Sequence, residues 1–295
     1  MNFFEAIILG FIQGVAEFLP ISSSGHLAIF KNFFGLEEAG IAYDILLHVG
    51  TLVAVFICFW SDIWELIVNG VGIVVDACKN IGRLFSNLFN KNKKDYTAKE
   101  YIDVISTPFR RYVMLIIVAT IPTGIMGILL KDMIEAVSAT LIVPGICLLM
   151  TSVILLIADN TKDGNENEEN VSYKKAGFVG ICQGFATMPG ISRSGTTVTA
   201  CLLAGMDRAF AVKFSFIVSI PAIIGAAILD LPDLFTTGVT GSEMINYVAG
   251  TIVSGVVGYI CIKTMLKIVR NKKFKVFSIY CAVMGLIAIV GSFAK

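Results

Sequence analysis

One pattern of fifteen residues occurs twice in this chain, and each time it interrupts a long apolar segment. Residues 13–27 read QGVAEFLPISSSGHL and residues 183–197 read QGFATMPGISRSGTT, with no gap and seven identical positions. The match continues upstream, because Ala6 and Gly10 both recur 170 residues later. Each copy places a proline or glycine beside several hydroxyl groups, which stops a helix there. The sequence therefore predicts an internal duplication with a break at the same point of each half.

The composition places both copies in a membrane. Hydrophobic residues make up 56% of the chain and charged residues 15%, whereas about a quarter of a soluble domain is charged. A soluble fold is therefore excluded, and no nucleic-acid partner is expected. The seven cysteines show no CxxC or CxH spacing, so neither a disulfide framework nor a zinc site is predicted. The first residues, MNFFEAIILG, lack a basic region and carry Glu5, so no cleavable signal peptide is expected.

Six segments are long and apolar enough to cross about 30 Å of hydrocarbon. They are Ile41–Trp60, Tyr112–Leu130, Ala136–Ala158 and residues 209–229, 244–266 and 276–294. The two interrupted stretches, at about 1–40 and about 176–206, are each predicted to form a re-entrant helix pair. A membrane accepts such irregular backbone only where protein or a wet cavity covers it. The expected fold is an all-α polytopic membrane protein.

Basic residues indicate the orientation. Residues 79–111 hold eight Lys/Arg against three acids, and residues 263–275 hold six Lys/Arg and no acid. By the positive-inside rule, both segments are expected on the cytoplasmic side. Residues 61–78 are ambiguous, because they could span the bilayer or lie in its interface as an amphipathic segment.

The ambiguous segment decides how the halves are related. If 61–78 stays at the cytoplasmic surface, each half has one re-entrant pair and three transmembrane helices. Three is odd, so the halves then form an inverted repeat, with both termini outside. The repeats would cover 1–158 and 176–295, with a cytoplasmic loop at about 61–111 and a cytoplasmic linker at 159–175. If 61–78 spans instead, the halves are parallel.

The second copy contains the parts of an anion receptor. A Pro-Gly turn precedes Ser192, which is placed to cap the helix that follows. Free N–H groups at that helix start, three hydroxyls and one guanidinium would together bind phosphate. The side chains are those of Ser192, Ser194, Thr196 and Arg193. An arginine inside a membrane costs roughly 2.5 kcal/mol or more, so it needs a partner. The alternative to phosphate is that Arg193 only neutralises Glu17.

The first copy differs at the positions that carry chemistry. It supplies a carboxylate, a hydroxyl and an imidazole from Glu17, Ser23 and His26. Against Arg193, these groups would provide a nucleophile, an acid/base and a charge clamp, as phosphoryl transfer requires. Gln13 and Glu17 lie four residues apart on one helix face. Their oxygens could hold Mg²⁺, which prefers to bind together with phosphate and waters.

Structural roles compete with these interpretations. Gln13 and Gln183 could simply bond one helix to another, and the hydroxyls could be small residues packed at a close helix crossing. Asp44 and His48 also share one helix face, but a direct role for them is less expected than a structural one.

QGVAEFLPISSSGHL followed by PGISRSGTT resembles the bacterial undecaprenyl-diphosphate phosphatase family, the bacitracin-resistance type, over essentially the whole chain. The resemblance implies a multi-pass hydrolase of the bacterial cytoplasmic membrane that removes the terminal phosphate of a polyprenyl diphosphate lipid. This reaction recycles the lipid carrier for peptidoglycan synthesis, supports cell-wall biogenesis and cell shape, and gives bacitracin resistance. The family also implies an inverted-repeat fold, a site open toward the outer face and a divalent cation, Mg²⁺ or Ca²⁺. Its members often dimerise, so a homodimer is left open here.

The same resemblance implies roles for individual residues. Gln13 and Glu17 match the family's metal-binding box, in which Gln13 departs from the charged pattern and leaves Glu17 as the principal acid. Ser23 matches the serine proposed as nucleophile and His26 the histidine beside it, and the choice between them stays open. Arg193 matches the arginine that holds diphosphate. The flanking substrate-binding positions are Ser22, Ser24, Gly25, Ser192, Ser194, Gly195 and Thr196.

A transporter is the alternative from another functional class. Inverted repeats with broken helices are typical of transporters, so the chain could be a lipid-phosphate flippase or an ion-coupled transporter. A transporter needs a binding site, but it does not need Glu17, Ser23 and His26 on one half against Arg193 on the other. This asymmetry favours the enzyme.

Overall fold

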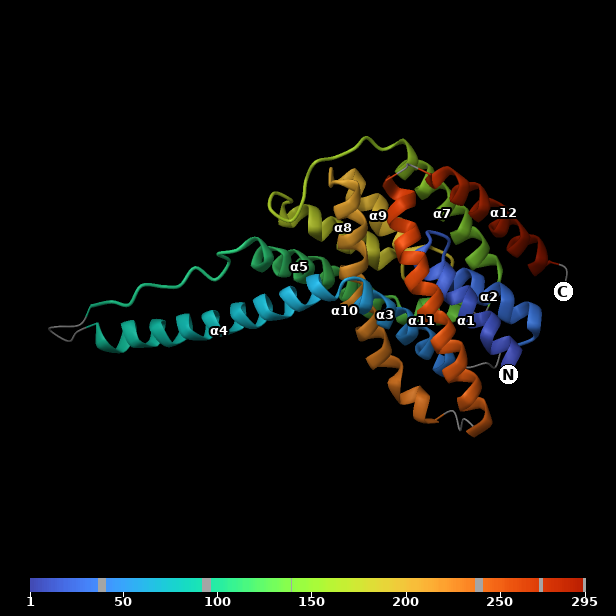
Figure 1. The fold of residues 1–295 in the computed structure, drawn as a ribbon, viewed down its shortest axis with the longest axis horizontal. Coiled ribbons are helices and arrows are strands. Elements are labelled where there is room, and N and C mark those ends of the chain that lie inside the picture. Colours follow the sequence, from blue (N-terminus) through green and yellow to red (C-terminus); the bar gives the residue numbers. More distant parts are fainter. Residues whose placement is uncertain (37–40, 92–96, 139, 237–240, 271–272, 294–295) are drawn as a thin grey trace.

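The computed structural model of the chain describes all residues except 37–40, 92–96, 139, 237–240, 271–272 and 294–295. The described residues form twelve α-helices and no β-strand, with one isolated bridge between Glu166 and Met206 (Figure 1). The predicted all-α class is confirmed.

The helices divide at residues 161–172, which connect α7 to α8. The helices before this connection are α1 (Phe3–Phe18), α2 (Ser23–Phe34), α3 (Ile41–Cys58), α4 (Trp60–Asn90), α5 (Pro108–Leu129), α6 (Lys131–Ser138) and α7 (Ile142–Asn160). Those after it are α8 (Tyr173–Phe185), α9 (Arg193–Leu203), α10 (Arg208–Thr236), α11 (Gly241–Arg270) and α12 (Phe274–Ser292).

Five helical segments within the described residues are long and apolar enough to cross a membrane. They are Pro108–Leu129, Ile142–Asn160, Arg208–Leu229, Glu243–Val269 and Phe274–Ser292. A sixth is added if α3 and α4, which meet at an angle of 88°, are counted together. The chain is therefore a multi-pass membrane protein, as its composition predicts.

The predicted start of the third span is wrong. We expected one helix from Ala136 to Ala158, but α6 covers Lys131–Ser138 and α7 begins only at Ile142. Pro144 explains the difference, because proline lacks an N–H and its ring clashes with the preceding turn. It fits without cost only near the start of a helix, and it lies in the first turn of α7.

The predicted loop at 61–111 is also wrong over much of its length. Residues 60–90 form the single long helix α4, and residues 97–107 run back beside it without regular structure. Charge density suggested a loop, but the apolar residues of this segment recur every three or four positions, which favours a helix.

The helices of the two halves pack across one another in matched pairs. α1 packs against α11, and α8 packs against α5. A Cβ atom on Gly10 would collide with the backbone of Gly250, and one on Gly180 would collide with the backbone of Ala119. Gly10 and Gly180 occupy the same position of the repeated pattern, so both copies approach their partner helix through a glycine.

This packing reveals a second match within the sequence. Residues 119–127 read ATIPTGIMG and residues 250–258 read GTIVSGVVG, with four identities and no gap. The offset is 131 residues here and 170 in the first match, so the first half carries 39 more residues between the two matched stretches. Most of α4 and of the segment that returns beside it account for this extra length.

The last helices of the halves, α7 and α12, pack side by side in opposite directions. Gly145, near the start of α7, lies against Gly285 of α12. Further along α7, the Ser152 hydroxyl lies 3.0 Å from the Ser278 hydroxyl. Because one residue number rises as the other falls, the two helices run antiparallel.

Candidate active site

The two breaks in the helical pattern meet inside the bundle. A Cβ on Gly25 would lie 3.0 Å from Gly190, and a Cβ on Gly195 would lie 3.1 Å from Pro20. Each glycine of one copy therefore touches the turn of the other copy, at equivalent positions. The Gly190 N–H also donates to the Ser24 hydroxyl at 3.2 Å. The mirrored bond does not form, since Pro20 has no N–H.

Both breaks use the same cap. Ser22 precedes α2 and accepts from the Gly25 N–H at 3.3 Å, while Ser192 precedes α9 and accepts from the Gly195 N–H at 3.1 Å. Ser22 has φ 71°, the only positive value for a residue other than glycine in the described part of the chain. Ser23 and Arg193 are the next residues, so each is the first residue of its helix. The starts of two helices, with their free N–H groups, are a favourable place for an anion.

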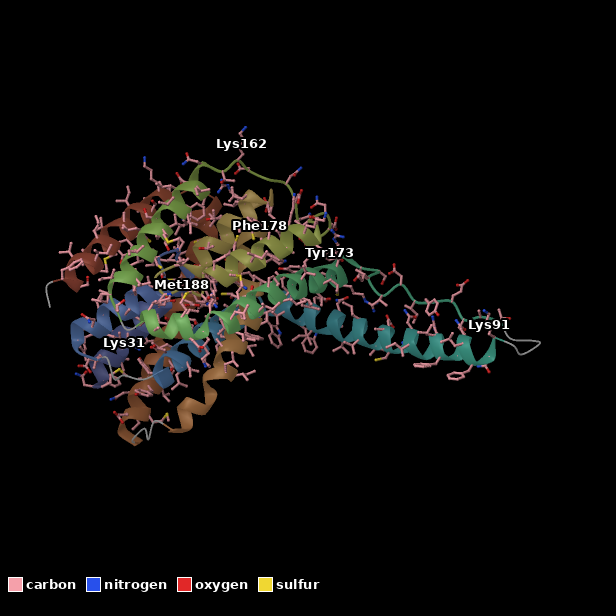
Figure 2. The ribbon with its side chains drawn as sticks, turned by 180° about the vertical axis from the view of Figure 1, so that it is seen from behind. Lys31, Lys91, Lys162, Tyr173, Phe178 and Met188 are labelled. Atoms are coloured by element: carbon pink, nitrogen blue, oxygen red, sulfur yellow. The ribbon has the colours of Figure 1, made fainter. Side chains whose placement is uncertain are left out.

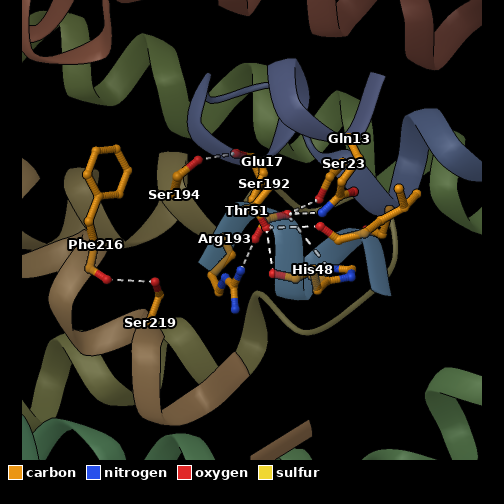
Figure 3. A network of polar contacts seen from close by, with 12 residues as sticks. Gln13, Glu17, Ser23, His48, Thr51, Ser192, Arg193, Ser194, Phe216 and Ser219 are labelled. Carbon is orange, nitrogen blue, oxygen red and sulfur yellow. Dashed lines mark hydrogen bonds and ion pairs between the residues drawn. The ribbon is translucent and has the colours of Figure 1, made fainter. Parts of the chain in front are cut away.

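Glu17 is the centre of the polar cluster. Its Oε2 atom accepts from Gln13 Nε2 at 3.0 Å and from Ser23 Oγ at 2.6 Å. Its Oε1 atom forms an ion pair with Arg193. The Nε2 atom of His48 lies 3.7 Å from Oε2. Figure 3 shows these side chains converging on the carboxylate from α1, α2, α3 and α9.

The cluster is enclosed by the bundle. Glu17 is only 6% exposed, and a carboxylate this deeply buried needs a counter-charge. Arg193 supplies it from 176 residues away in the sequence. The structure therefore contains the predicted contact between the acid of the first copy, Glu17, and the cation of the second copy, Arg193. The Ser23 bond is a charge-assisted O–H···O⁻ contact, which is the stronger class of hydrogen bond.

His26 lies outside this cluster. Its Nδ1 atom is 2.8 Å from the Ser22 carbonyl oxygen, and its Nε2 atom is 2.8 Å from the Tyr280 hydroxyl. The two rings stack with an interplanar angle of 5°. A carbonyl can only accept, so Nδ1 carries the proton and Nε2 accepts from Tyr280 if the ring is neutral. Both ring nitrogens are therefore engaged away from Glu17.

The amide of Gln13 bears on the metal that the resemblance implies. Gln13 is fully buried, and its Oε1 atom has no hydrogen-bond partner among the described residues. Together with the Glu17 carboxylate it offers hard oxygen donors of the type that Mg²⁺ takes. Gln183, in the copy without a carboxylate, has the same unpaired Oε1 atom, so that atom alone does not mark a metal site. No group of three or more His, Cys, Asp or Glu that could hold a metal occurs in the described part of the chain.

The remaining predicted residues surround the two helix starts. The Ser192 and Ser194 hydroxyls lie 3.4 Å apart, as do those of Ser22 and Ser24. Thr196, the counterpart of His26, has a buried hydroxyl with no partner among the described residues. These groups add hydroxyls around the two helix starts.

A polar cavity of about 390 Å³ adjoins the cluster. His48 and Ser24 line it, together with Lys31 and Asp44, whose charged atoms are 2.6 Å apart. His48 lies both on this cavity and beside Glu17, so it connects the two. A larger cavity of about 570 Å³ lies between α5 and α10, and its lining is almost wholly apolar. No residue of the Glu17 cluster lines it, although Thr187, the equivalent of Glu17 in the second copy, does.

Sequence reasoning undervalued His48 and missed Tyr280. The sequence relates His48 to Asp44 on its own helix, but in the structure its Nε2 atom lies beside the Glu17 carboxylate on α1. Tyr280 lies 254 residues from His26, and nothing near it in the sequence is polar enough to attract attention. The scarcity of histidine is the available signal, because the chain has only two and His26 lies directly after the first helix break.

Comparison with known proteins gives one consistent result. The family model described as bacitracin resistance protein BacA matches residues 6–287. The undecaprenyl-diphosphatase of Methanosphaera stadtmanae is 40% identical over 290 residues, which cover 98% of both chains. That of Desulforapulum autotrophicum is 38% identical over 293 residues and 99% of both chains. Undecaprenyl-diphosphatase 4 of Bacillus thuringiensis is 37% identical over 289 residues, 98% of this chain and 97% of the relative.

Proposed function

The chain belongs to the bacitracin resistance protein BacA family, and we propose that it hydrolyses undecaprenyl diphosphate to undecaprenyl phosphate and phosphate. The relatives are named for this activity and match over nearly their whole length. The reaction returns a lipid carrier to peptidoglycan synthesis, and removal of the diphosphate form gives resistance to bacitracin.

One observation carries the chemistry: the Ser23 hydroxyl donates to Glu17 at 2.6 Å, while the other oxygen of Glu17 pairs with Arg193. A serine bonded to a carboxylate has a base in place to take its proton. A guanidinium beside that carboxylate is placed to grip the phosphate that the serine would attack. These are the parts of a phosphoryl-transfer site.

In the first step, the terminal phosphate binds the guanidinium of Arg193 in place of Glu17, and it accepts hydrogen bonds from the hydroxyls of Ser192 and Ser194. Glu17, released from its ion pair, accepts the proton of Ser23. The Ser23 oxygen bonds to the terminal phosphorus, and the bond from that phosphorus to the bridging oxygen breaks. Undecaprenyl phosphate leaves with the electron pair of that bond.

In the second step, water replaces the serine. Glu17 passes on the proton that it holds to the Ser23 oxygen as the bond between that oxygen and phosphorus breaks, and a water molecule supplies the new oxygen on phosphorus. Inorganic phosphate is released and the serine is restored. In both steps Arg193 stabilises the negative charge on the equatorial oxygens of the transferred phosphoryl group. Phosphoryl transfer gains most of its rate from electrostatic stabilisation of this kind.

A divalent cation would be held by Glu17 and the unpaired amide oxygen of Gln13, with phosphate oxygens completing its ligands. When bound, it would neutralise phosphate charge. We expect the bound cation to be Mg²⁺, with Ca²⁺ as the alternative.

The halves are proposed to form an inverted repeat, with α1–α2 and α8–α9 as re-entrant pairs. The reciprocal contacts of Gly25 with Gly190 and of Gly195 with Pro20 support this, as do the antiparallel α7 and α12. The basic segments at 79–111 and 263–275 support a cytoplasmic position for that end of the bundle, which leaves the substrate to reach the cluster from the outer side.

Phosphate release from a polyprenyl diphosphate by the purified protein in detergent tests this proposal. Arg193→Ala, Glu17→Gln and Ser23→Ala should each lower turnover by about 10²-fold or more, the scale seen when a transition-state donor is removed. Arg83→Ala, which removes an arginine on α4, is the matched control and should keep full turnover. Turnover retained in Arg193→Ala would defeat the assignment.

The metal and the rival function are tested with the same preparation. Chelator should stop phosphate release and added Mg²⁺ should restore it; release that is unchanged by chelator would remove the cation from the proposal. In liposomes, movement of the lipid without phosphate release would decide for a transporter.

A further inference from the structure

The long helix α4 leaves the bundle after its first turns. Only Phe59 separates its start from the end of α3, and its axis makes an angle of 88° with that of α3. Its root is fixed by buried Ile63 and by an ion pair between Asp62 and Lys213 of α10 at 2.5 Å. The rest extends well beyond the other helices, and Lys91 at its end lies far from Lys31 in the bundle (Figures 1 and 2). At 1.5 Å per residue, its 31 residues span about 46 Å.

One face of α4 is already covered by the chain itself. The side chain of Asn80 exchanges two hydrogen bonds of 2.8 Å with the backbone of Ile102. Asn87 does the same with Lys99, at 3.0 and 2.9 Å. Residues 97–107 therefore lie along the polar face like a strap, and that face needs no other partner.

The opposite face is apolar and exposed. We call it the apolar stripe: positions 60, 64, 67, 71, 74, 78, 81, 85 and 88 carry exposed Trp, Ile, Val, Leu, Phe or Cys, at intervals of four and three. Val74 is 61% exposed and Phe85 54%. No described part of the chain covers this stripe, which makes it a surface that requires an occupant.

The width of the stripe argues against a second α4 as that occupant. A two-stranded coiled coil has a narrow seam flanked by charged residues. Here exposed apolar residues extend beyond the seam on one side, at Val68, Val75 and Phe89. A broad apolar face opposite a polar one, on a helix that is not apolar enough to span alone, is typical of helices that lie in a membrane interface.

The position and charge of α4 agree with a lipid surface. The axis of α4 makes an angle of 88° with that of α3, so the two helices cannot both follow the direction that spans the bilayer. Trp60 and Trp64, the only tryptophans of the chain, stack at 6.0 Å at its root, and tryptophan is enriched where hydrocarbon meets headgroups. Residues 79–111 carry eight Lys/Arg against three acids, which attracts anionic headgroups.

We propose that α4 is a surface anchor, lying flat in the interface of the cytoplasmic leaflet, with its apolar stripe among acyl chains and its strap facing the cytoplasm. Its ligand is anionic phospholipid. Because most of α4 belongs to the extra length of the first half, this role is separate from the proposed phosphatase chemistry.

Spin labels on α4 of the full-length protein in nanodiscs test the proposal. Cys78 lies on the stripe and is the only exposed cysteine of the described residues, so it can be labelled directly. The matched control carries Cys78→Ser and Lys79→Cys, which moves the label by about 100° around the helix. In discs with phosphatidylglycerol, the label at 78 should meet dissolved oxygen several-fold more often than a water-soluble nickel chelate. The label at 79 should show the reverse.

Three outcomes would overturn the proposal. Equal access of the nickel chelate to both labels would mean that α4 projects into water. Spin–spin broadening between labels at 78, with protection from both reagents, would mean that a second copy covers the stripe. Accessibility at 78 that is the same in neutral phosphatidylcholine discs would remove the requirement for anionic lipid.

Discussion

Ser23 and His26 stand one helical turn apart on α2, yet their side chains have different partners. Ser23 donates to Glu17, whereas the His26 ring is held between the Ser22 carbonyl and the Tyr280 hydroxyl. A histidine that attacks phosphorus needs a free ring nitrogen, and Nε2 is engaged. The geometry therefore favours Ser23 as the nucleophile and His26 as a residue that holds the start of α2 in place.

This choice predicts the behaviour of Tyr280→Phe. The variant removes only the hydroxyl, so turnover should stay within a few-fold, while the free energy of unfolding falls by about 1 kcal/mol for one partly buried hydrogen bond. Phosphate release and thermal unfolding in detergent measure the two effects.

A trapped intermediate provides the check. With radiolabelled substrate, the phosphorylated protein should be stable in acid, as phosphoserine is, and absent from Ser23→Ala. An acid-labile phosphoryl group that persists in Ser23→Ala, with faster turnover in Tyr280→Phe, would make His26 the nucleophile instead.

At the residue scale, the sequence was informative where chemistry is unusual. A guanidinium and a carboxylate inside a membrane each need a partner, so the Glu17–Arg193 pair could be anticipated from composition and the duplication. The partners of His26 and His48 could not, because both depend on how distant helices pack. Tyr280 comes from α12 and Glu17 from α1, and no local pattern encodes either contact.

At the scale of helices, the glycines of the repeated pattern predict where the bundle is least tolerant. In Gly10→Ala the new methyl meets the Gly250 backbone, and in Gly180→Ala it meets that of Ala119. Backbone cannot move aside as a flexible side chain can, so the free energy of unfolding of each variant should fall by about 1–3 kcal/mol. Thermal unfolding in detergent is the measurement.

Gly124→Ala is the matched control. It lies in helix α5 with no atom within 4 Å of an added Cβ, and alanine favours a helix over glycine by about 1 kcal/mol. Its stability should be unchanged or higher. A loss as large as that of Gly10→Ala would show that glycine matters there for a reason other than contact.

Helix boundaries were predicted well where hydropathy decides them and poorly where a single residue does. Pro144 moved the start of α7, and the regular apolar spacing of α4 outweighed its charges. The match between residues 119–127 and 250–258 is weaker and has an offset of 131 residues instead of 170, so it does not align with the first match and is recognised only once the helix pairs are known.

At the scale of the whole molecule, the extra length of the first half predicts that its outer part is dispensable for catalysis. Replacing residues 81–101 by a short Gly-Ser turn would join the chain at the bonded pair Asn80 and Ile102. The root contact of Asp62 with Lys213 remains. No residue of the Glu17 cluster lies on the removed segment, and surface segments of this kind tolerate deletion, so phosphate release in detergent should stay within about twofold.

The full-length protein in the same detergent is the control for this variant. A large loss of turnover there, without a fall in thermal stability, would show that α4 acts on the site directly.

The two reciprocal touches between the helix breaks limit how the protein can move. A see-saw motion would have to press Gly25 further into Gly190 while it lifted Gly195 from Pro20, or the reverse. A single added methyl group on either glycine would lie 3.0 or 3.1 Å from the opposite turn, so there is little free space at either contact. Rocking of this kind would therefore be opposed at the centre of the molecule, and a carrier that exposed its load first to one side and then to the other would have to separate one of these contacts in each half of its cycle.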